Sequence, residues 1–192
     1  LFTLRVFEPR YLELVKECAT TRRGFGVCLI SKGHEVGGGD ERFEYGTVSE
    51  ILQVAEIGNG QLAISCVGRK RFRVLRWLED SPYPKAVVEI EEVADSELIK
   101  QEQIDELKPV LLKIADTVFE LSGIKQVKVV PSSANIIEEL YHLAEHSFLG
   151  AFDRYKVLSS ETLETRFNLL SQLLCDLDEM YTGELKLRNQ TD

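Results

Sequence analysis

This chain of 192 residues has no long apolar run and no closely spaced pair of cysteines. A membrane-spanning helix needs about 18 consecutive apolar residues, and a secretory signal needs a charged, an apolar and a small-residue region in that order. Neither pattern occurs. The cysteines, at 18, 28, 66 and 175, include no Cys-x-x-Cys pair, so we expect neither a zinc knuckle nor a disulfide framework. These absences predict a cytoplasmic protein with buried, reduced thiols.

Positive charge is scarce, and its distribution is uneven. The net charge is −9; residues 1–94 hold 13 basic and 14 acidic side chains, whereas residues 95–192 hold 10 and 18. The second half therefore repels phosphate backbones. The chain also has no Gly-x-x-x-x-Gly-Lys-Ser/Thr loop to cradle phosphates, and we expect no cofactor.

The first half has the two-residue periodicity of β-strands. Between Phe25 and Val93, β-branched and aromatic residues alternate with polar ones and are interrupted by turn signals, among them "GNG" at 58–60, which predicts a hairpin. Long alternating strands of this kind tend to curl into a small barrel. Residues 1–94 are therefore expected to form an antiparallel β-barrel, with a helix at about 8–20.

After Asp95 the apolar period changes to that of helices. The expected helices span about 96–121, with Pro109 as a kink or restart, then 134–147 and 161–181, the last ending at Gly183. A short turn is expected at 151–158, and the C-terminal tail is expected to fray. The fold class is thus α+β, an antiparallel barrel at 1–94 followed by a helical bundle at 95–192.

The segment "HLAEH" at 142–146 has the His-x-x-Glu-His spacing of one class of zinc peptidases. On a helix His142 and His146 lie on one face, and Glu145 could activate a metal-bound water. The same face is the polar side of the expected helix, and only 46 residues follow for a distal ligand. We therefore favour a polar helix surface without metal, with a zinc hydrolase as a remote alternative.

The stretch "FEPRY" at 7–11 follows a short alternating strand and opens a helix. Pro9 suits the first helical position, and Glu8 places negative charge at the helix N-terminus. These residues can be purely structural. Glu8 and Arg10 flank Pro9, and at least one of them is expected to pair with a charged or backbone group of the barrel, with Arg71 or Arg73 as candidate neighbours of a partly buried Glu8.

This stretch also resembles a known family. The sequence "LRVFEPRYLELVKECATTRRG" is similar to the Lon protease N-terminal (substrate-binding) domain family, and the likeness continues in order through "YGTVSEI", "GRKRFRV", "PYPKAVVE" and "TRFNLLSQLL". The resemblance implies a PUA-like β-barrel followed by a helical bundle. It also marks as candidate structural or binding residues Phe7, Glu8, Pro9, Arg10, Tyr11, Gly46, Gly68, Arg71 and Phe72.

The function that the resemblance implies is non-catalytic. In Lon this domain helps engage protein substrates, while ATP hydrolysis and peptide cleavage reside elsewhere. The chain resembles either an excised N-terminal region or one of the small stand-alone bacterial proteins built from this domain. We expect it to bind unfolded polypeptides or a protein partner in degradation or quality control. The binding site is expected at a barrel edge or in the crease between barrel and bundle, and the protein could form a homo-oligomer.

An RNA-binding PUA-like protein is the alternative. The segment "GRKRFRVLR" holds Arg69, Lys70, Arg71, Arg73 and Arg76. In a strand these charges divide between two faces, which makes a poor surface for a phosphate backbone.

One departure from the family pattern concerns the start of the chain. Family members usually have an apolar strand and a Phe-Pro-Gly-like turn before the strand that leads into the motif, whereas here Leu1 and Phe2 run directly into Thr3. This difference predicts a short loop between Phe2 and Thr3, and further residues before Leu1.

Overall fold

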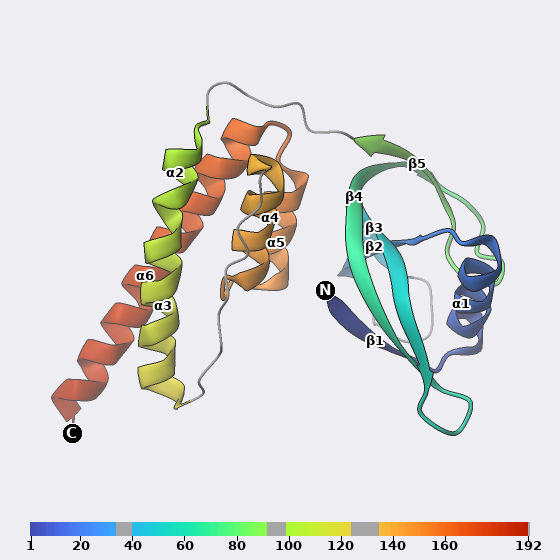
Figure 1. Ribbon diagram of the computed structural model, residues 1–192, viewed down its shortest axis with the longest axis horizontal. Coiled ribbons are helices and arrows are strands. Elements are labelled where there is room, and N and C mark those ends of the chain that lie inside the picture. The colour runs from blue at the N-terminus through green and yellow to red at the C-terminus, as the bar shows by residue number, and fades with distance from the viewer. Residues whose placement is uncertain (34–39, 92–98, 124–134, 192) are drawn as a thin grey trace. The chain divides into compact units, whose positions relative to one another are not determined.

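The computed structural model describes residues 1–33, 40–91, 99–123 and 135–191. They belong to two compact units, Leu1–Glu92 and Val93–Asp192, which are described separately (Figure 1). The expected domain boundary at 94/95 lies outside the described residues.

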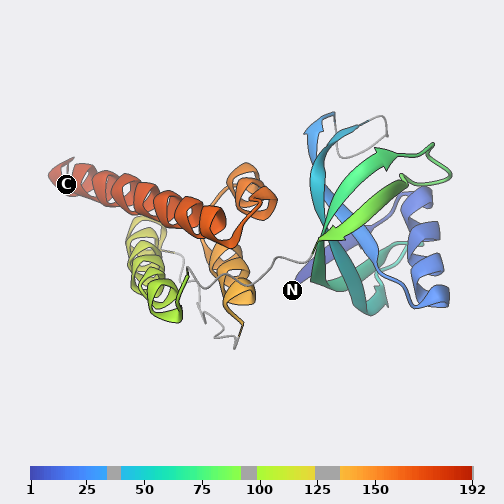
Figure 2. The ribbon, with the colours of Figure 1, turned by 90° about the horizontal axis from the view of Figure 1, so that it is seen from above.

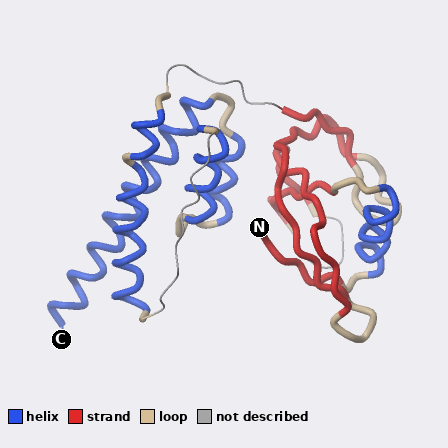
Figure 3. Tube along the Cα trace, in the orientation of Figure 1, coloured by secondary structure: helices blue, strands red, loops and turns tan. Residues whose placement is uncertain are grey.

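The first unit is built on one antiparallel sheet of five strands, with α1 packed against it (Figures 1 and 3). Four strands lie in the order β1-β4-β3-β2, and β5 pairs with β4 as well. Their bounds are β1 Phe2–Val6, β2 Phe25–Lys32, β3 Glu41–Glu56, β4 Leu62–Trp77 and β5 Ala86–Glu91. The expected antiparallel β fold of the first half is confirmed.

Strand β4 organises this sheet because β1 and β5 share one of its sides. Strand β1 pairs with its first part, from Phe2 opposite Cys66 to Val6 opposite Leu62, and β5 pairs with its second part. The other side of β4 pairs with β3, which in turn pairs with β2. The two edges of the sheet are β2 on one side and β1 together with β5 on the other. The sheet curls strongly (Figure 2).

The expected hairpin is present between β3 and β4. Gly58, Asn59 and Gly60 all have positive φ values, of 90°, 52° and 70°, which glycine and asparagine adopt most readily. The backbone N–H of Ile57 donates to the carbonyl of Gln61 and closes the turn.

Helix α1 spans Pro9–Thr21, with Pro9 at its first position as the sequence predicts. The helix ends at Arg22 in the left-handed conformation, two residues before the expected stop at Gly24. Its inner face packs on the sheet, where Val15 joins a buried cluster with Val6, Ile64 and Cys66. This packing fixes the position of the motif at the start of the helix.

The loop expected between Phe2 and Thr3 is absent, and that prediction is wrong. Phe2 and Thr3 occupy consecutive positions of β1, opposite Cys66 and Ser65. Ladder pairing at both residues leaves no room for an inserted loop.

The second unit consists of helices, as the fold class predicts (Figure 3). They are α2 Gln101–Asp105, α3 Leu107–Ser122, α4 Ile136–His146, α5 Ala151–Ser159 and α6 Leu163–Thr191. Their apolar faces meet in one core around Leu111, Ile114, Leu140, Leu143 and Leu170, all of which are fully buried. None of the helices in the described part of the chain combines the length and apolarity that crossing a membrane requires.

Two features of the helical unit differ from the sequence prediction. The segment expected as a turn is helix α5, because Val157 is buried in the core and Asp153 pairs with Lys156. Helix α6 continues through Gly183 to Thr191. Tertiary contact overrides the weak propensity of glycine here, since Arg188 donates to the last carbonyls of α3.

The helical unit also buries two charged side chains. Glu139 is fully buried on α4, where it forms an ion pair with Lys108 Nζ at 2.5 Å and accepts a hydrogen bond from Gln101 Nε2 at 2.6 Å. Arg166 is fully buried on α6 and donates to the carbonyls of Val157 and Ser160. These bonds tie the short helices to the long ones.

We predict that Lys108→Ala destabilises the helical unit by about 3 kcal/mol, because it removes the cation from a buried carboxylate. The matched control is Lys113→Ala, which breaks the more exposed pair between Lys113 and Asp178 and should cost under about 1 kcal/mol. Urea unfolding followed by circular dichroism at the helical band measures both. Equal losses would contradict the assigned role of Glu139.

Candidate functional site

The sheet unit has an apolar groove of about 580 Å³. Its lining comes from the edge strands β1, β2 and β5, from the start of α1, and from parts of β3 and β4. The free edges of the sheet therefore border this groove. We call it the sheet groove.

Apolar side chains that are only half-buried line the sheet groove. Phe7 is 48% exposed and Trp77 40%, and Leu4, Val27 and Val88 are close to these values. They come from the β1–α1 turn, the end of β4, β1, β2 and β5. An exposed cluster of large apolar groups is unfavourable in water and commonly marks a binding surface.

The floor of the groove depends on Phe72, which is 3% exposed. A side chain at Gly46 would collide with the Phe72 ring and would lie 2.5 Å from the Val27 carbonyl oxygen. At Gly26 the first side-chain atom would be 3.0 Å from the Phe72 ring. The absence of side chains at both glycines lets the ring lie against the backbone of β2 and β3.

Two arginines near the rim of the groove pair with carboxylates, whereas Arg5, which also lines it, donates to the side chain of Gln61. Arg10 binds Glu8 through Nε and Nη2, both at 3.0 Å, and stacks on Tyr11. Arg42 pairs with Asp40 at 3.2 Å and lies over the ring of Trp77. Both pairs are electrically neutral, and Arg5 adds one positive charge to the margin of the apolar groove.

A tyrosine at the end of the groove links two elements. Tyr83 is buried, and its hydroxyl donates to the carboxylate of Glu17 on α1. This hydrogen bond, with burial, raises the pKa of Tyr83 to about 12. The hydroxyl therefore stays a donor at neutral pH and holds the β4–β5 connection against α1.

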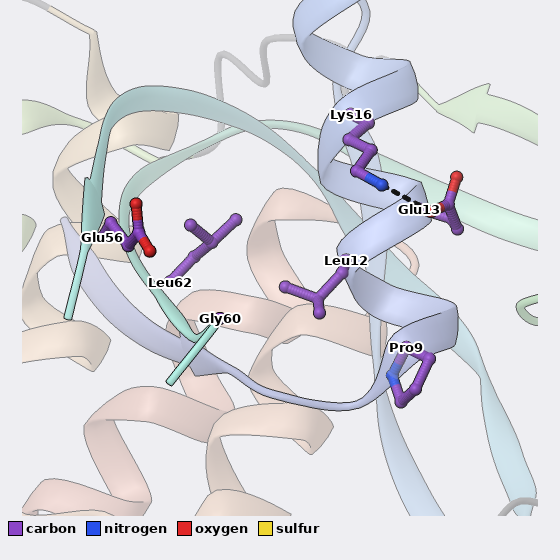
Figure 4. A pocket seen from close by; sticks show the side chains of 7 residues that line it. All are labelled: Pro9, Leu12, Glu13, Lys16, Glu56, Gly60 and Leu62. Atoms are coloured by element: carbon purple, nitrogen blue, oxygen red, sulfur yellow. Dashed lines mark hydrogen bonds and ion pairs between the residues drawn. The ribbon is translucent and has the colours of Figure 1, made fainter. Parts of the chain in front are cut away.

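The predicted motif residues divide between groove and scaffold. Phe7, Glu8, Tyr11 and Phe72 line the sheet groove. Pro9 starts α1 and faces a smaller pocket of about 280 Å³ between α1 and the β3–β4 hairpin (Figure 4). In that pocket Leu12 and Leu62 supply the apolar surface, and Lys16 pairs with Glu13 at its margin.

The remaining predicted residues lie elsewhere. Arg71 is buried, pairs with Glu91 on β5 at 2.7 Å and stacks on Tyr45. Gly68 is exposed, and a side chain there would come within 2.9 Å of Thr47. Neither residue lines the groove, and both hold neighbouring strands together.

The expected partners of Glu8 are wrong. Glu8 pairs with Arg10, its neighbour across Pro9, whereas Arg71 pairs with Glu91 and Arg73 with Glu44. The proline begins the helix between them, and the bend there brings the two side chains of the motif together. Local geometry thus satisfies Glu8 without a barrel arginine.

Sequence reasoning missed several residues that line the groove. Val27, Trp77 and Val88 were assigned only to strands, and Arg42 was not singled out. The one signal available was the alternation of each strand, which places Val88 on the face of its ladder partner Val74. Which strands meet across the groove depends on the sheet order, which alternation does not encode.

The cysteines are free thiols of unequal burial. Cys18 and Cys66 are buried as expected, Cys28 is partly buried and lines the groove, and Cys175 is exposed, contrary to expectation. Burial raises the pKa of Cys28 to about 11. Its sulfur is therefore protonated at neutral pH and a poor nucleophile.

The histidine segment has the expected arrangement on α4. Leu140, Leu143 and Ala144 are buried, while Glu145 is exposed between the two half-buried histidines. The potential ligand atoms of His142, Glu145 and His146 lie within 4.8 Å of one another. In the described part of the chain no fourth metal-ligating side chain joins them. Nδ1 of His146 is 2.8 Å from the carbonyl oxygen of His142.

Comparison with known families gives a match along most of the chain. The model of the ATP-dependent protease La (LON) substrate-binding domain matches residues 1–176. The Lon protease of Anaeromyxobacter dehalogenans is 26% identical over 98% of this chain, and Lon protease 2 of Myxococcus xanthus is likewise 26% identical over 98%. The chain spans only 22% and 23% of the lengths of these two relatives.

Two solved structures share the fold. A Lon N-terminal domain protein from Xanthomonas campestris is 30% identical, with a TM-score of 0.58 over 91% of this chain and 88% of its own. The N-terminal domain of a Mycobacterium avium complex Lon protease has a TM-score of 0.53 over 93% and 90%, at 15% identity. The resemblance found in the sequence is thereby confirmed.

We predict that Glu8→Ala lowers the melting temperature of the sheet unit by about 5 °C, because it leaves the largely buried Arg10 without its carboxylate. Glu13→Ala breaks the exposed pair with Lys16 and serves as the control, with a shift under about 2 °C. Fluorescence of Trp77, which lies in this unit, reports its unfolding. An unchanged melting temperature for Glu8→Ala would show that Glu8 has a surface role and not a structural one.

We predict that the histidine segment holds no zinc at stoichiometric occupancy. Tetrahedral zinc, with bonds of about 2.0–2.1 Å, needs neighbouring ligand atoms about 3.4 Å apart, and structural sites use four protein ligands. Metal analysis after dialysis should find under about 0.1 zinc per chain. One zinc per chain that is lost in His142→Ala would overturn this prediction.

Proposed function

Since the chain belongs to the family of the ATP-dependent protease La (LON) substrate-binding domain, we propose that it binds unfolded polypeptide in the sheet groove and catalyses no reaction itself. The family match covers residues 1–176 and supports substrate binding in general terms. The choice of ligand and of site rests on the groove.

The observation that carries the proposal is the exposed apolar lining next to the family motif. Phe7 of the motif and Trp77 expose 48% and 40% of their surface in a groove of about 580 Å³. Small-molecule pockets typically span roughly 300–1,000 Å³, so this volume accommodates several apolar side chains. An unfolded chain presents such side chains, whereas a folded protein has buried them.

The polar groups of the groove support a binding role rather than catalysis. The carboxylates of Glu8 and Asp40 are each paired with an arginine, and that of Glu17 accepts the Tyr83 hydroxyl. The Cys28 thiol has a pKa raised to about 11. A nucleophile with an adjacent base, which covalent catalysis requires, is therefore not found among the described groove residues.

The ion pairs of arginines on β4 make RNA an unfavourable ligand. Arg69 pairs with Glu50 at 2.7 Å, Arg71 with Glu91 at 2.7 Å and Arg73 with Glu44 at 3.7 Å. Carboxylates beside these cations repel a phosphate backbone. We therefore propose a polypeptide ligand, presented in cytoplasmic degradation or quality control.

Binding of one isolated segment is expected to be weak, in the micromolar range or above. Ordering an extended chain offsets much of the contact free energy. A homo-oligomer or a partner protease would raise the apparent affinity by holding several groove–client contacts at once.

The test compares one client in two states. A disulfide-stabilised protein should bind when reduced and carboxymethylated, and should not bind when folded. The unfolded complex should survive nuclease and moderate salt. Equal binding of both states, or binding to RNA alone with a steep salt dependence, would eliminate the proposal.

Matched variants test whether the client binds in the groove. Phe7→Asp puts a carboxylate into the apolar lining and should weaken binding of the unfolded client about tenfold. Leu52→Asp changes an equally exposed apolar residue of β3 outside the groove, and should leave affinity within about twofold. Fluorescence anisotropy measures both, after circular dichroism has shown that the variants are folded. Equal effects would show that the groove is not the site.

A further inference from the structure

Strand β2 has a free edge that borders the sheet groove. It pairs with β3 on one side, and among the described strands none pairs with its other side. The backbone hydrogen bonds found outside helices and sheet ladders in the described residues also do not involve β2. Residues 24–28 of this strand and the turn before it line the groove. Unused main-chain donors and acceptors thus lie beside the apolar lining.

Natural proteins usually guard a free strand edge with charges, proline or a bulge. The first part of β2, Phe25–Cys28, has none of these: it pairs in continuous register with residues 46–49 and holds only uncharged residues. Register shifts begin only after Cys28. The other edge is guarded, since β1 carries Arg5 and β5 carries Glu89 and Glu91.

The residues of β2 also leave its backbone accessible from the groove. Gly26 has no side chain, and the space that one would fill lies 3.0 Å from the Phe72 ring. Next to it, Val27 is 38% exposed. Gly26 and Val27 are both exposed, so an incoming chain can approach the main chain of β2 and place its own side chains in the sheet groove.

We propose that the bound polypeptide adds as a β-strand to the free edge of Phe25–Cys28, with alternate side chains in the sheet groove. This inference rests on the proposed function and specifies its mode. Main-chain hydrogen bonds supply affinity that is independent of sequence, and the groove selects apolar residues at every second position. Because the groove is lined mainly by apolar side chains, the segment it takes is uncharged, free of proline and about five residues long.

Backbone methylation of the ligand tests this mode without changing the protein. The probe is a fluorescent peptide of about nine residues in which valine and threonine alternate, with solubilising lysines at its ends. Two further peptides have the same side chains but carry N-methyl groups on all the valines or on all the threonines. In an extended strand these two sets of N–H groups point to opposite sides.

Strand addition requires the two methylated peptides to differ. The peptide that is methylated on the N–H groups facing β2 should lose at least about tenfold in affinity. The peptide that is methylated on the N–H groups facing away should stay within about threefold of the unmethylated parent. Equal affinities of the two methylated peptides would overturn strand addition, while binding of the parent would still support the groove. Failure of the parent peptide and of the unfolded client to bind would overturn the proposed function as well.

Discussion

The close approach of Phe72 to Gly46 is the contact on which the sheet unit depends. A side chain at Gly46 would occupy the space of the Phe72 ring, so these strands can pair at this curvature only with glycine there. The ring is 3% exposed and forms the floor beneath β2. Curvature at this point turns the two edges of the sheet inward, and the sheet groove lies between them.

The consequence is a unit that leaves apolar surface uncovered. Its buried cluster around Val15 and Ile64 lies under α1, whereas Phe7, Trp77 and Val27 stay half-exposed. The helical unit has a larger buried core, in which Glu139 pairs with Lys108 and Arg166 donates to the Val157 carbonyl. The buried cluster and the proposed binding surface of the sheet unit share residues, since Val15 and Ile64 also line the groove.

Much of the fold follows from local pattern. Two-residue alternation, the Gly-Asn-Gly turn and Pro9 at the start of a helix predict the strands, the β3–β4 hairpin and α1, because each depends on neighbours in sequence. Local pattern failed where tertiary contact decides. Helix α5 forms over an expected turn because Val157 reaches the core, and α6 passes through Gly183 because its far end is bonded to α3.

The site was predictable only in part, for the same reason. The motif pointed to Phe7, Glu8 and Tyr11, which do line the groove. Val27 and Val88, which also line it, are far apart in sequence and are brought together by the order of the strands. The sequence pattern does not show the Glu8–Arg10 pair, because it depends on the bend of the chain at Pro9.

Hydrogen exchange of the protein with and without a permanently unfolded client tests the central claim most directly. If the client lies in the sheet groove against β2, amides of Phe25–Lys32 should exchange more slowly in the complex, while those of the outer part of β3, residues 51–56, should be unchanged. Slower exchange confined to the helical unit, or to β3 but not β2, would contradict the account.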